Sequence, residues 1–345
     1  MPSITFMSGR KILLTHGSDQ GFGGIERHVV ELAESLTDRY QVAVMVDQRQ
    51  FHHFSEKITC LPVEMTRSRS HPGLLWDAHK QIRTFQPDIV HAHGGKAAAI
   101  VKTIKLIKPS LKTIVTVHGY KKDTRCYNGH QAVIAVSKRV ASMLSCPAEQ
   151  ITVITNGIQP QPTLQTGPDF PEKTHPFTFL TIGRLAPVKG YDILLDAFKG
   201  IDAKLWLVGD GPEEAKLKQQ AAQLGIEDQV WFAGRRDDIG YLIENTDCCL
   251  LSSRREGCPY VLGEALLANK PVVSTDVGNC AEILPASWIC ETENPAALHE
   301  LMKKAASQPD LLFANQQEVF QLAKQSYSLE HMTKQVEKLY QKVLS

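Results

Sequence analysis

The chain has 345 residues, of which 43% are hydrophobic and 22% charged, and its formal net charge is +1. This length exceeds what one hydrophobic core usually supports, so two domains are expected. No stretch approaches the roughly 18 apolar residues of a membrane-spanning helix, and the first residues lack the apolar core of a secretory signal. The eight cysteines form no CxxC pair, which favours reduced thiols in a cytoplasmic protein over a secreted disulfide framework.

The near-zero net charge hides a difference between the two halves of the chain. Residues 1–157 contain 20 Lys and Arg against 12 Asp and Glu, a balance of +8. Residues 158–345 contain 18 against 25, a balance of −7. A basic half and an acidic half are expected to meet different partners.

The first half alternates short apolar runs with helical patterns, which predicts a parallel, doubly wound sheet. Helices are predicted from Ile25 onward and over 73–85 and 96–107. The predicted strands cover residues 11–16, 41–46, 88–92, 112–117, 132–136 and 151–154. Ligands bind such sheets at the carboxyl ends of the strands, where His16, His91, His93 and His118 are found. Each of these histidines is open to a structural or a ligand-facing role.

The loop after the first predicted strand is rich in glycine, with Gly17, Gly21, Gly23 and Gly24 before the helix. Their spacing does not match the G-x-G-x-x-G of dinucleotide-binding proteins. Two interpretations stay open, namely a structural tight turn and a loop whose backbone approaches a phosphate or a sugar.

A basic edge is predicted on the helix over 96–107, where Lys102, Lys105 and Lys108 follow at helical spacing. It is either a solvated helix face or a surface for an anionic acceptor or an acidic membrane. No RNA-binding motif or aromatic interleaving accompanies it, so nucleic acid is not an expected partner.

A proline-rich segment at 159–176 is predicted to be an extended linker between two domains. The predicted N-terminal domain is 1–158 and the C-terminal domain 177–326, in which the strand and helix alternation starts again. A final amphipathic helix over 327–344 follows. The fold class predicted from this order is α/β, with two Rossmann-like doubly wound domains.

Within the C-terminal half, the stretch 250–269 joins a buried strand to a helix through a loop. Glu256 precedes the helix and Glu264 lies about two turns further along the chain, so both can approach a ligand at the helix N-terminus, where free amides favour phosphate. Arg184 and Lys189 follow the first strand of this domain. Fixed cations beside a helix N-terminus are what a diphosphate requires. Solvated acids remain the simpler interpretation of the glutamate pair alone.

Taken in order, several short motifs resemble the family 4 (group 1) glycosyltransferases of the GT-B fold over nearly the whole chain. They are Gly23-Gly24-Ile25-Glu26, His118-Gly119, Asn156-Gly157-Ile158, Gly183-Arg184-Leu185, Lys189-Gly190, Val208-Gly209-Asp210-Gly211-Pro212 and the pair Glu256 and Glu264. The resemblance implies a retaining hexosyltransferase with a nucleotide-sugar donor in a cleft between two domains. It also implies that the last helix, 327–345, crosses back to pack on the first domain.

The resemblance assigns roles to individual residues of this chain. Arg184 and Lys189 would bind the donor diphosphate, and Glu264 the ribose. Glu256 would lie at the donor sugar and His118 would approach that sugar from the first domain. The remaining donor-binding positions implied are Gly23, Gly24, Arg235, Gly257, Cys258, Pro259 and Tyr260. Cys258 and the segment 278–282 depart from the commoner family pattern and touch the implied sugar pocket.

No metal ion and no other cofactor are expected, because no D-x-D pair occurs in the chain and cationic side chains can stabilise the leaving diphosphate. The expected acceptor is a glycan or a lipid-linked glycan, as in lipopolysaccharide or other cell-surface polysaccharide assembly. We expect a UDP-sugar as donor, and a cytoplasmic protein whose basic first domain can meet the inner face of the membrane. The competing hypotheses are a nicotinamide-dependent oxidoreductase, which the missing G-x-G-x-x-G disfavours, and a non-catalytic sugar-binding protein.

Overall fold

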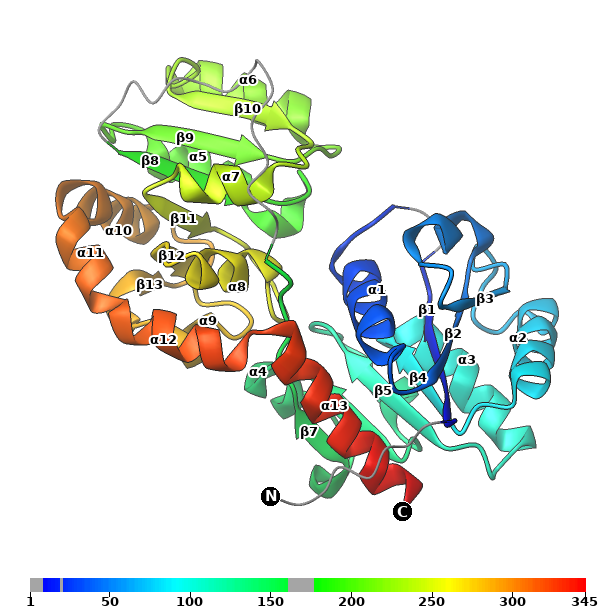
Figure 1. Cartoon of the computed structure of the whole chain (residues 1–345). Helices are drawn as coiled ribbons and strands as arrows, with labels where there is room; N and C mark the ends of the chain where they lie inside the picture. Colours follow the sequence, from blue (N-terminus) through cyan, green and yellow to red (C-terminus); the bar gives the residue numbers. More distant parts are fainter. Residues whose placement is uncertain (1–8, 19–20, 161–176) are drawn as a thin grey trace. The chain divides into compact units, whose positions relative to one another are not determined.

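The computed structural model describes residues 9–18, 21–160 and 177–345 (Figure 1). The chain forms two compact units, each with its own parallel sheet. The first unit comprises residues 1–157 and 328–345, and the second unit comprises residues 158–327. Most of the predicted linker, residues 161–176, lies outside the described part of the chain.

The sheet of the first unit has seven strands in the order β3-β2-β1-β4-β5-β6-β7, and all neighbouring pairs are parallel. Its central strands are buried on both faces because helices cover both, as expected for parallel sheets. The strands are β1 (Lys11–His16), β2 (Gln41–Val46), β3 (Thr59–Pro62), β4 (Ile89–His93), β5 (Thr113–Val117), β6 (Ala132–Ala135) and β7 (Ile151–Val153).

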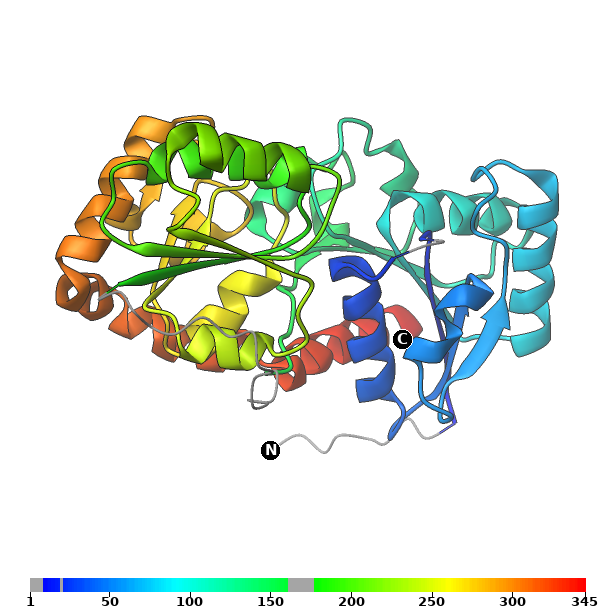
Figure 2. The ribbon, with the colours of Figure 1, turned by 90° about the horizontal axis from the view of Figure 1, so that it is seen from above.

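Helices cover the two faces of this sheet (Figures 1 and 2). Helix α1 packs against α13, while α2 packs against α3. The helices are α1 (Gly24–Leu36), α2 (Pro72–Phe85), α3 (Gly94–Ile107), α4 (Lys138–Ser142) and α13 (Leu329–Leu344), with 3-10 turns η1 (Gln48–His53), η2 (Arg125–Tyr127) and η3 (Ala148–Gln150).

The C-terminal helix belongs to the first unit, which confirms the predicted return of the chain. Met332, Val336 and Tyr340 of α13 join the core formed by α1 and the sheet. The hydroxyl of Tyr340 lies 2.7 Å from Nδ1 of His91 on β4. The helix begins at Leu329, two residues later than predicted, because the Ser328 hydroxyl accepts the backbone N–H of residue 331 and caps it there.

The second unit has a six-stranded sheet in the order β10-β9-β8-β11-β12-β13, again parallel throughout. Its strands are β8 (Thr178–Ile182), β9 (Lys204–Val208), β10 (Val230–Gly234), β11 (Cys248–Leu251), β12 (Val272–Thr275) and β13 (Ile289–Cys290). Its helices are α5 (Tyr191–Phe198), α6 (Glu214–Leu224), α7 (Ile239–Glu244), α8 (Tyr260–Leu267), α9 (Cys280–Ile283), α10 (Pro295–Ser307), α11 (Pro309–Asn315) and α12 (Gln317–Ser326), with turns η4 (Pro187–Lys189) and η5 (Ala286–Trp288).

The predicted fold class is confirmed, since both units are α/β with parallel sheets. In the first sheet, the strand order reverses direction between β1 and β4, and in the second sheet between β8 and β11. Ligands of open α/β sheets bind outside the carboxyl ends of the strands at such points. The loops that leave these four strands are therefore where each unit is expected to bind its ligand.

Candidate functional site

The loops that follow β8 and β11 meet at the reversal point of the second sheet. Nζ of Lys189, at the end of η4, donates to Oε1 of Glu256 at 2.7 Å. The Ser253 hydroxyl donates to the same carboxylate oxygen at 2.8 Å. Residues 67 positions apart thus form an ion pair, with 24% of the lysine and 15% of the glutamate side chain exposed. A cation and a carboxylate are thus held together where a ligand is expected.

Arg254 fastens these two loops to each other. Its guanidinium makes two parallel bonds of 2.8 Å to the carboxylate of Asp192 at the start of α5. It also donates to the carbonyl of Pro187 at 2.6 Å and contacts Glu293. Because a forked guanidinium fixes direction as well as distance, Arg254 sets the position of η4, and η4 carries Lys189.

Two glycines allow this close approach of the loops. Gly190 has φ of 64°, and a Cβ on it would lie 2.2 Å from the carbonyl oxygen of Ser252. Gly209, after β9, has φ of 135°, and a Cβ there would lie 2.0 Å from the carbonyl oxygen of Gly183. Only glycine combines these φ values with such contacts at low cost. The glycines of the Lys189-Gly190 and Gly209 motifs therefore allow the loops after β8, β9 and β11 to pack closely together.

Arg184 lies in the first of these loops and is exposed. Within the described residues its guanidinium has no carboxylate partner, unlike the nearby Arg254. A cation without a fixed anion remains available for an external one. Arg184 and Lys189 both belong to the segment that connects β8 to α5.

The helix predicted after the Glu256 loop is confirmed as α8, which begins at Tyr260 after Pro259. No side chain among the described residues caps its N-terminus, so its first amides are available to an anion or a hydroxyl. The turn before it, with Gly257 and Cys258, is buried. Gly278, with φ of 55°, packs on it, since a Cβ there would meet the carbonyl of Gly257 at 2.9 Å.

Two further predicted donor-binding residues differ in their exposure to solvent. Glu264 is buried in α8, with 8% of its surface exposed, and α8 packs on β11. Arg235 follows β10 and is exposed. Its neighbour Arg236 is engaged instead, because it forms a two-bonded ion pair with Asp238 at 2.9 and 2.6 Å.

In the first unit, the glycine-rich loop leads directly into α1. Gly23 is the N-cap residue, and its N–H donates to Oε2 of Glu26 at 2.8 Å. A carboxylate therefore already occupies this helix start and is favoured there by the helix dipole. Gly24 is the first residue of α1. The open alternatives for this loop, a structural turn or a phosphate-approaching loop, both fit this cap.

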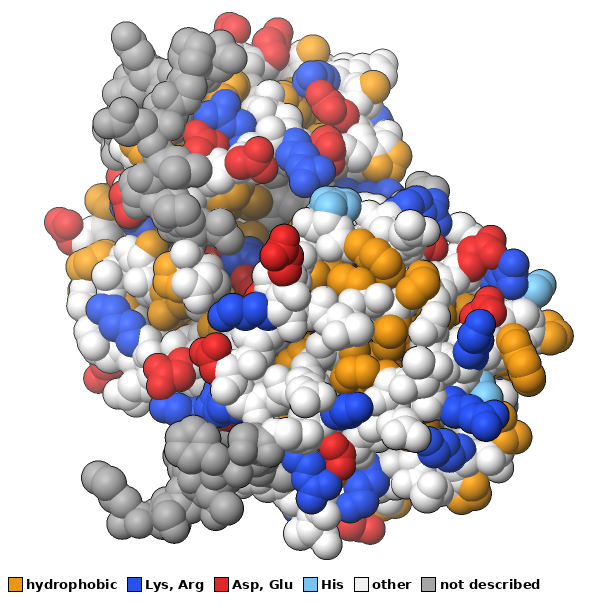
Figure 3. All heavy atoms as spheres, turned by 45° about the vertical axis from the view of Figure 1, so that its right-hand side comes forward, with side chains coloured by type: hydrophobic (Ala, Val, Ile, Leu, Met, Phe, Trp, Pro, Cys, Tyr) orange, Lys and Arg blue, Asp and Glu red, His pale blue; other side chains and the backbone are white. Residues whose placement is uncertain are grey.

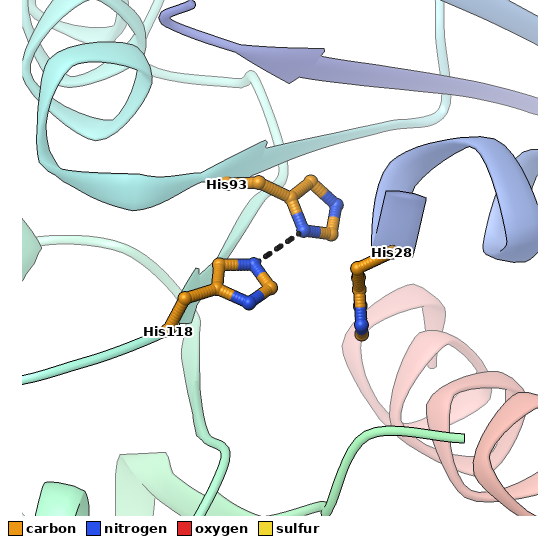
Figure 4. Close-up of side chains that lie close together, drawn as sticks. All are labelled: His28, His93 and His118. Atoms are coloured by element: carbon orange, nitrogen blue, oxygen red, sulfur yellow. Dashed lines mark hydrogen bonds between the residues drawn. The ribbon is translucent and has the colours of Figure 1, made fainter. Parts of the chain in front are cut away.

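Histidines gather at the reversal point of the first sheet (Figure 4). His93 ends β4, and its Nδ1 lies 3.2 Å from Nε2 of His118, which follows β5. His28 projects from α1, and its ring centre is 5.2 Å from that of His93 and 4.7 Å from that of His118. His16 pairs in register with His93 across β1 and β4.

Burial keeps these imidazoles neutral. It lowers the pKa of His28 to about 4 and that of His91 to about 3. Burial, together with the neighbouring imidazoles, also holds the pKa of His93 and of His118 well below the ordinary value. At neutral pH the cluster therefore offers nitrogen lone pairs rather than positive charge.

Sequence reasoning missed two residues of these sites. His28 sits on the buried side of α1 with Val29 and Leu32, and a histidine inside an apolar stripe is a signal that could have identified it. Arg254 lies beside the exposed Arg255 in the same loop, and no local pattern of the sequence distinguishes the two.

Two family models match the chain, one in each half. "Glycosyltransferase Family 4" matches residues 22–161, and "Glycosyl transferases group 1" matches residues 167–321. The chain belongs to the family 4, group 1 glycosyltransferases. It is therefore a glycosyltransferase, as its ordered motifs predicted.

Similar glycosyltransferases match most of the chain. An uncharacterized glycosyltransferase of Methanocaldococcus jannaschii is 25% identical over 84% of this chain and 86% of its own. The lipopolysaccharide core biosynthesis glycosyltransferase LpsD of Rhizobium meliloti is 25% identical over 80% of each chain. The structure of Anabaena HepE in complex with UDP-glucose has a TM-score of 0.81 and 22% identity, and the match covers 96% of this chain and 99% of HepE. That likeness establishes the GT-B fold.

Proposed function

We propose that this glycosyltransferase moves a sugar from a UDP-sugar, with retention of anomeric configuration, to a glycan or lipid-linked acceptor in the assembly of a cell-surface polysaccharide. The observation that carries this proposal is the Lys189–Glu256 ion pair of 2.7 Å at the reversal point of the second sheet. Two relatives support the substrate classes. HepE binds UDP-glucose, and LpsD is named for lipopolysaccharide core biosynthesis.

The proposed chemistry begins with cleavage of the bond between the anomeric carbon and the diphosphate. Negative charge grows on the leaving diphosphate, and Arg184 and Lys189 stabilise it together with the first amides of α8. Loss of one such donor typically costs about 3 kcal/mol, or about 100-fold in rate. The acceptor hydroxyl attacks from the same face, and the departing phosphate oxygen takes its proton.

The carboxylates serve binding in this proposal and are not nucleophiles. Glu256 contacts the donor sugar once the diphosphate has taken Lys189 from it, and Glu264 binds the ribose hydroxyls. The turn from Gly257 to Tyr260 supplies amides to the sugar, and Arg235 lines the base. His118 of the first unit takes part as a neutral imidazole that accepts or donates a hydrogen bond to the sugar.

We further propose that transfer needs no metal ion, because the cations of the 183–189 segment do the work of one. Chelation with EDTA should leave the rate unchanged within twofold. A rate that collapses on chelation and returns with Mg²⁺ or Mn²⁺ would contradict this.

The acceptor proposal rests on the first unit. The end of α3 exposes Leu106 by 77% and Ile107 by 69% next to basic residues, and Figure 3 shows a face on which Lys and Arg side chains lie beside exposed apolar ones. Lys102 and Lys105 also donate to backbone carbonyls at 2.7 Å, so part of their bonding capacity is used within the fold. Among the described residues, no helix is long and apolar enough to span a bilayer.

The decisive experiment combines a thermal-shift panel of nucleotide sugars with a turnover assay. A donor that binds only the native state raises its melting temperature. Lys189→Ala should abolish that shift for UDP and lower donor turnover by about 100-fold, while Lys199→Ala, a change of an exposed lysine on α5's C-terminal side, should do neither. Binding of UDP without turnover of any donor would favour a non-catalytic sugar-binding protein. Binding of NADH and not of nucleotide sugars would favour an oxidoreductase.

A further inference from the structure

The histidine cluster of the first unit holds more ring nitrogens than a single donor-sugar contact uses. His28, His93 and His118 come from α1, β4 and the loop after β5. Each offers a nitrogen such that the three atoms lie within 4.8 Å of one another. Figure 4 shows the three rings converging on one volume between α1 and the ends of the strands.

One candidate ligand nitrogen of the cluster, Nδ1 of His28, is fully buried and makes no hydrogen bond of normal geometry within the described structure. Asn156 is the polar side chain that faces this ring. Nε2 of His93, the ring nitrogen that does not face His118, is also buried without a hydrogen-bonding partner among the described residues. A buried polar atom without a partner costs on the order of 1–3 kcal/mol, and such atoms call for an explanation. The contrast is His130, also buried in this unit, whose two ring nitrogens lie 3.1 and 3.2 Å from Thr113 and the carbonyl of Cys126.

The spacing of the nitrogens is close to that of a transition-metal site. Imidazole nitrogens bind Zn²⁺ at about 2.0–2.1 Å, so tetrahedral ligands stand about 3.4 Å apart. Nδ1 of His93 and Nε2 of His118 are already 3.2 Å apart. All three nitrogens lie within 4.8 Å of one another, so side-chain shifts of roughly 1 Å would bring them to tetrahedral spacing. His118 is partly exposed, which gives an ion and its fourth ligand, a water molecule, a way in.

We propose that His28, His93 and His118 form a three-histidine site for a divalent transition-metal ion of the Zn²⁺ class. The ion replaces the proton shared by His93 and His118. The imidazole that carried this proton takes it on its other nitrogen, so the metal binds without a net loss of protons. Three neutral imidazoles and an open fourth position are a typical Zn²⁺ ligand set.

This site has a consequence for activity that rests on the proposed function. An ion bound to His118 fixes the ring that the proposed function places against the donor sugar, so the ion would inhibit transfer. The same protein then needs no metal for catalysis and is switched off by one.

Metal binding is measured on the full-length protein without any donor. Calorimetric titration with ZnCl₂ should give one tight site, and Co²⁺ should give the visible absorption of a nitrogen and oxygen environment without the charge-transfer band of a thiolate. His28→Ala and His93→Ala should each weaken binding by at least about 10-fold, by analogy with the 10–100-fold losses seen even for residues that only support ligands. Matched melting curves establish that both variants fold.

Two controls make the result specific. His130→Ala removes a buried histidine whose nitrogens are both engaged, and it should leave Zn²⁺ affinity within twofold. The double change His52→Ala/His53→Ala removes two adjacent rings 3.9 Å apart, the competing histidine pair, and should also have no effect. Equal affinity in wild type and in folded His28→Ala, a thiolate band with Co²⁺, or loss of binding in the His52/His53 variant would overturn the proposal.

The activity arm separates this inference from the proposed function. For each variant, the transfer rate with Zn²⁺ is divided by its own rate with EDTA. The ratio should fall in wild type and in His130→Ala and stay near one in His28→Ala. Tight Zn²⁺ binding in a protein that transfers no sugar would sink the proposed function and leave the metal site standing. A ratio that falls equally in His28→Ala would overturn the inhibitory role.

Discussion

Glu256→Gln tests whether a diphosphate competes with Glu256 for Lys189. The substitution keeps the shape of the side chain and removes its charge, and Ser253 can still donate to the amide oxygen. In the wild type, the ammonium of Lys189 is satisfied by the carboxylate at 2.7 Å. A diphosphate that binds Lys189 must break this pair and then bear the nearby negative charge.

The size of the effect follows from the burial of the pair. At an effective dielectric constant of 20, opposite charges about 4 Å apart attract by about 4 kcal/mol, and the exposures of 24% and 15% put this pair in such an intermediate environment. If about one third of the attraction between Lys189 and Glu256 must be given up when UDP binds, removing the Glu256 charge strengthens UDP binding by about 1.4 kcal/mol, or tenfold in affinity. Glu256→Gln should therefore bind UDP about tenfold more tightly while it transfers sugar more slowly.

The assay is calorimetric titration with UDP, which lacks the sugar that Glu256 is proposed to contact. Glu293→Gln is the matched control, because it neutralises another carboxylate paired to a cation of the same loops. It should change UDP affinity by less than twofold. Unchanged or weaker UDP binding by a folded Glu256→Gln protein would refute the competition between carboxylate and diphosphate.

Three further outcomes are expected. Arg254→Lys loses its two-bonded carboxylate contact and should lower the free energy of unfolding by about 1–2 kcal/mol and raise donor KM; an unchanged melting temperature would show that the loops need no such fastening. His28 has a folded-state pKa of about 4 against about 6.5 unfolded, so the unfolded state binds more protons between these values. The contribution of His28 to the free energy of unfolding should be fully present above pH 6.5 and should be lost as the pH falls towards 4, by up to about 3 kcal/mol. In His28→Asn the fall should be shallower, and parallel curves in pH-dependent urea unfolding would contradict this. Leu106→Ser with Ile107→Ser should weaken partitioning to anionic vesicles several-fold, whereas Leu322→Ser, also exposed, should not; equal partitioning in a sedimentation assay would remove the membrane surface.

The sequence by itself determined the strands and the order of the two α/β units. Buried parallel strands are short apolar runs whatever their neighbours are, so the predicted bounds of β1 and β2 coincide with the structure. Strands β3 and β13 were missed because they lie at the sheet edges, have four and two residues, and are only partly buried. Their pairing partner, rather than their composition, makes them strands.

Only the tertiary structure decided which side chains meet. Glu256 and Lys189 are 67 residues apart, and the ion pair exists because β8 and β11 are neighbours in the sheet. The local signal at His28, a histidine within an apolar stripe, predicts burial but not its partners, and only the fold brings its ring next to His93 and His118. Local patterns report burial and period, whereas a site depends on contacts between distant segments, which strand order creates.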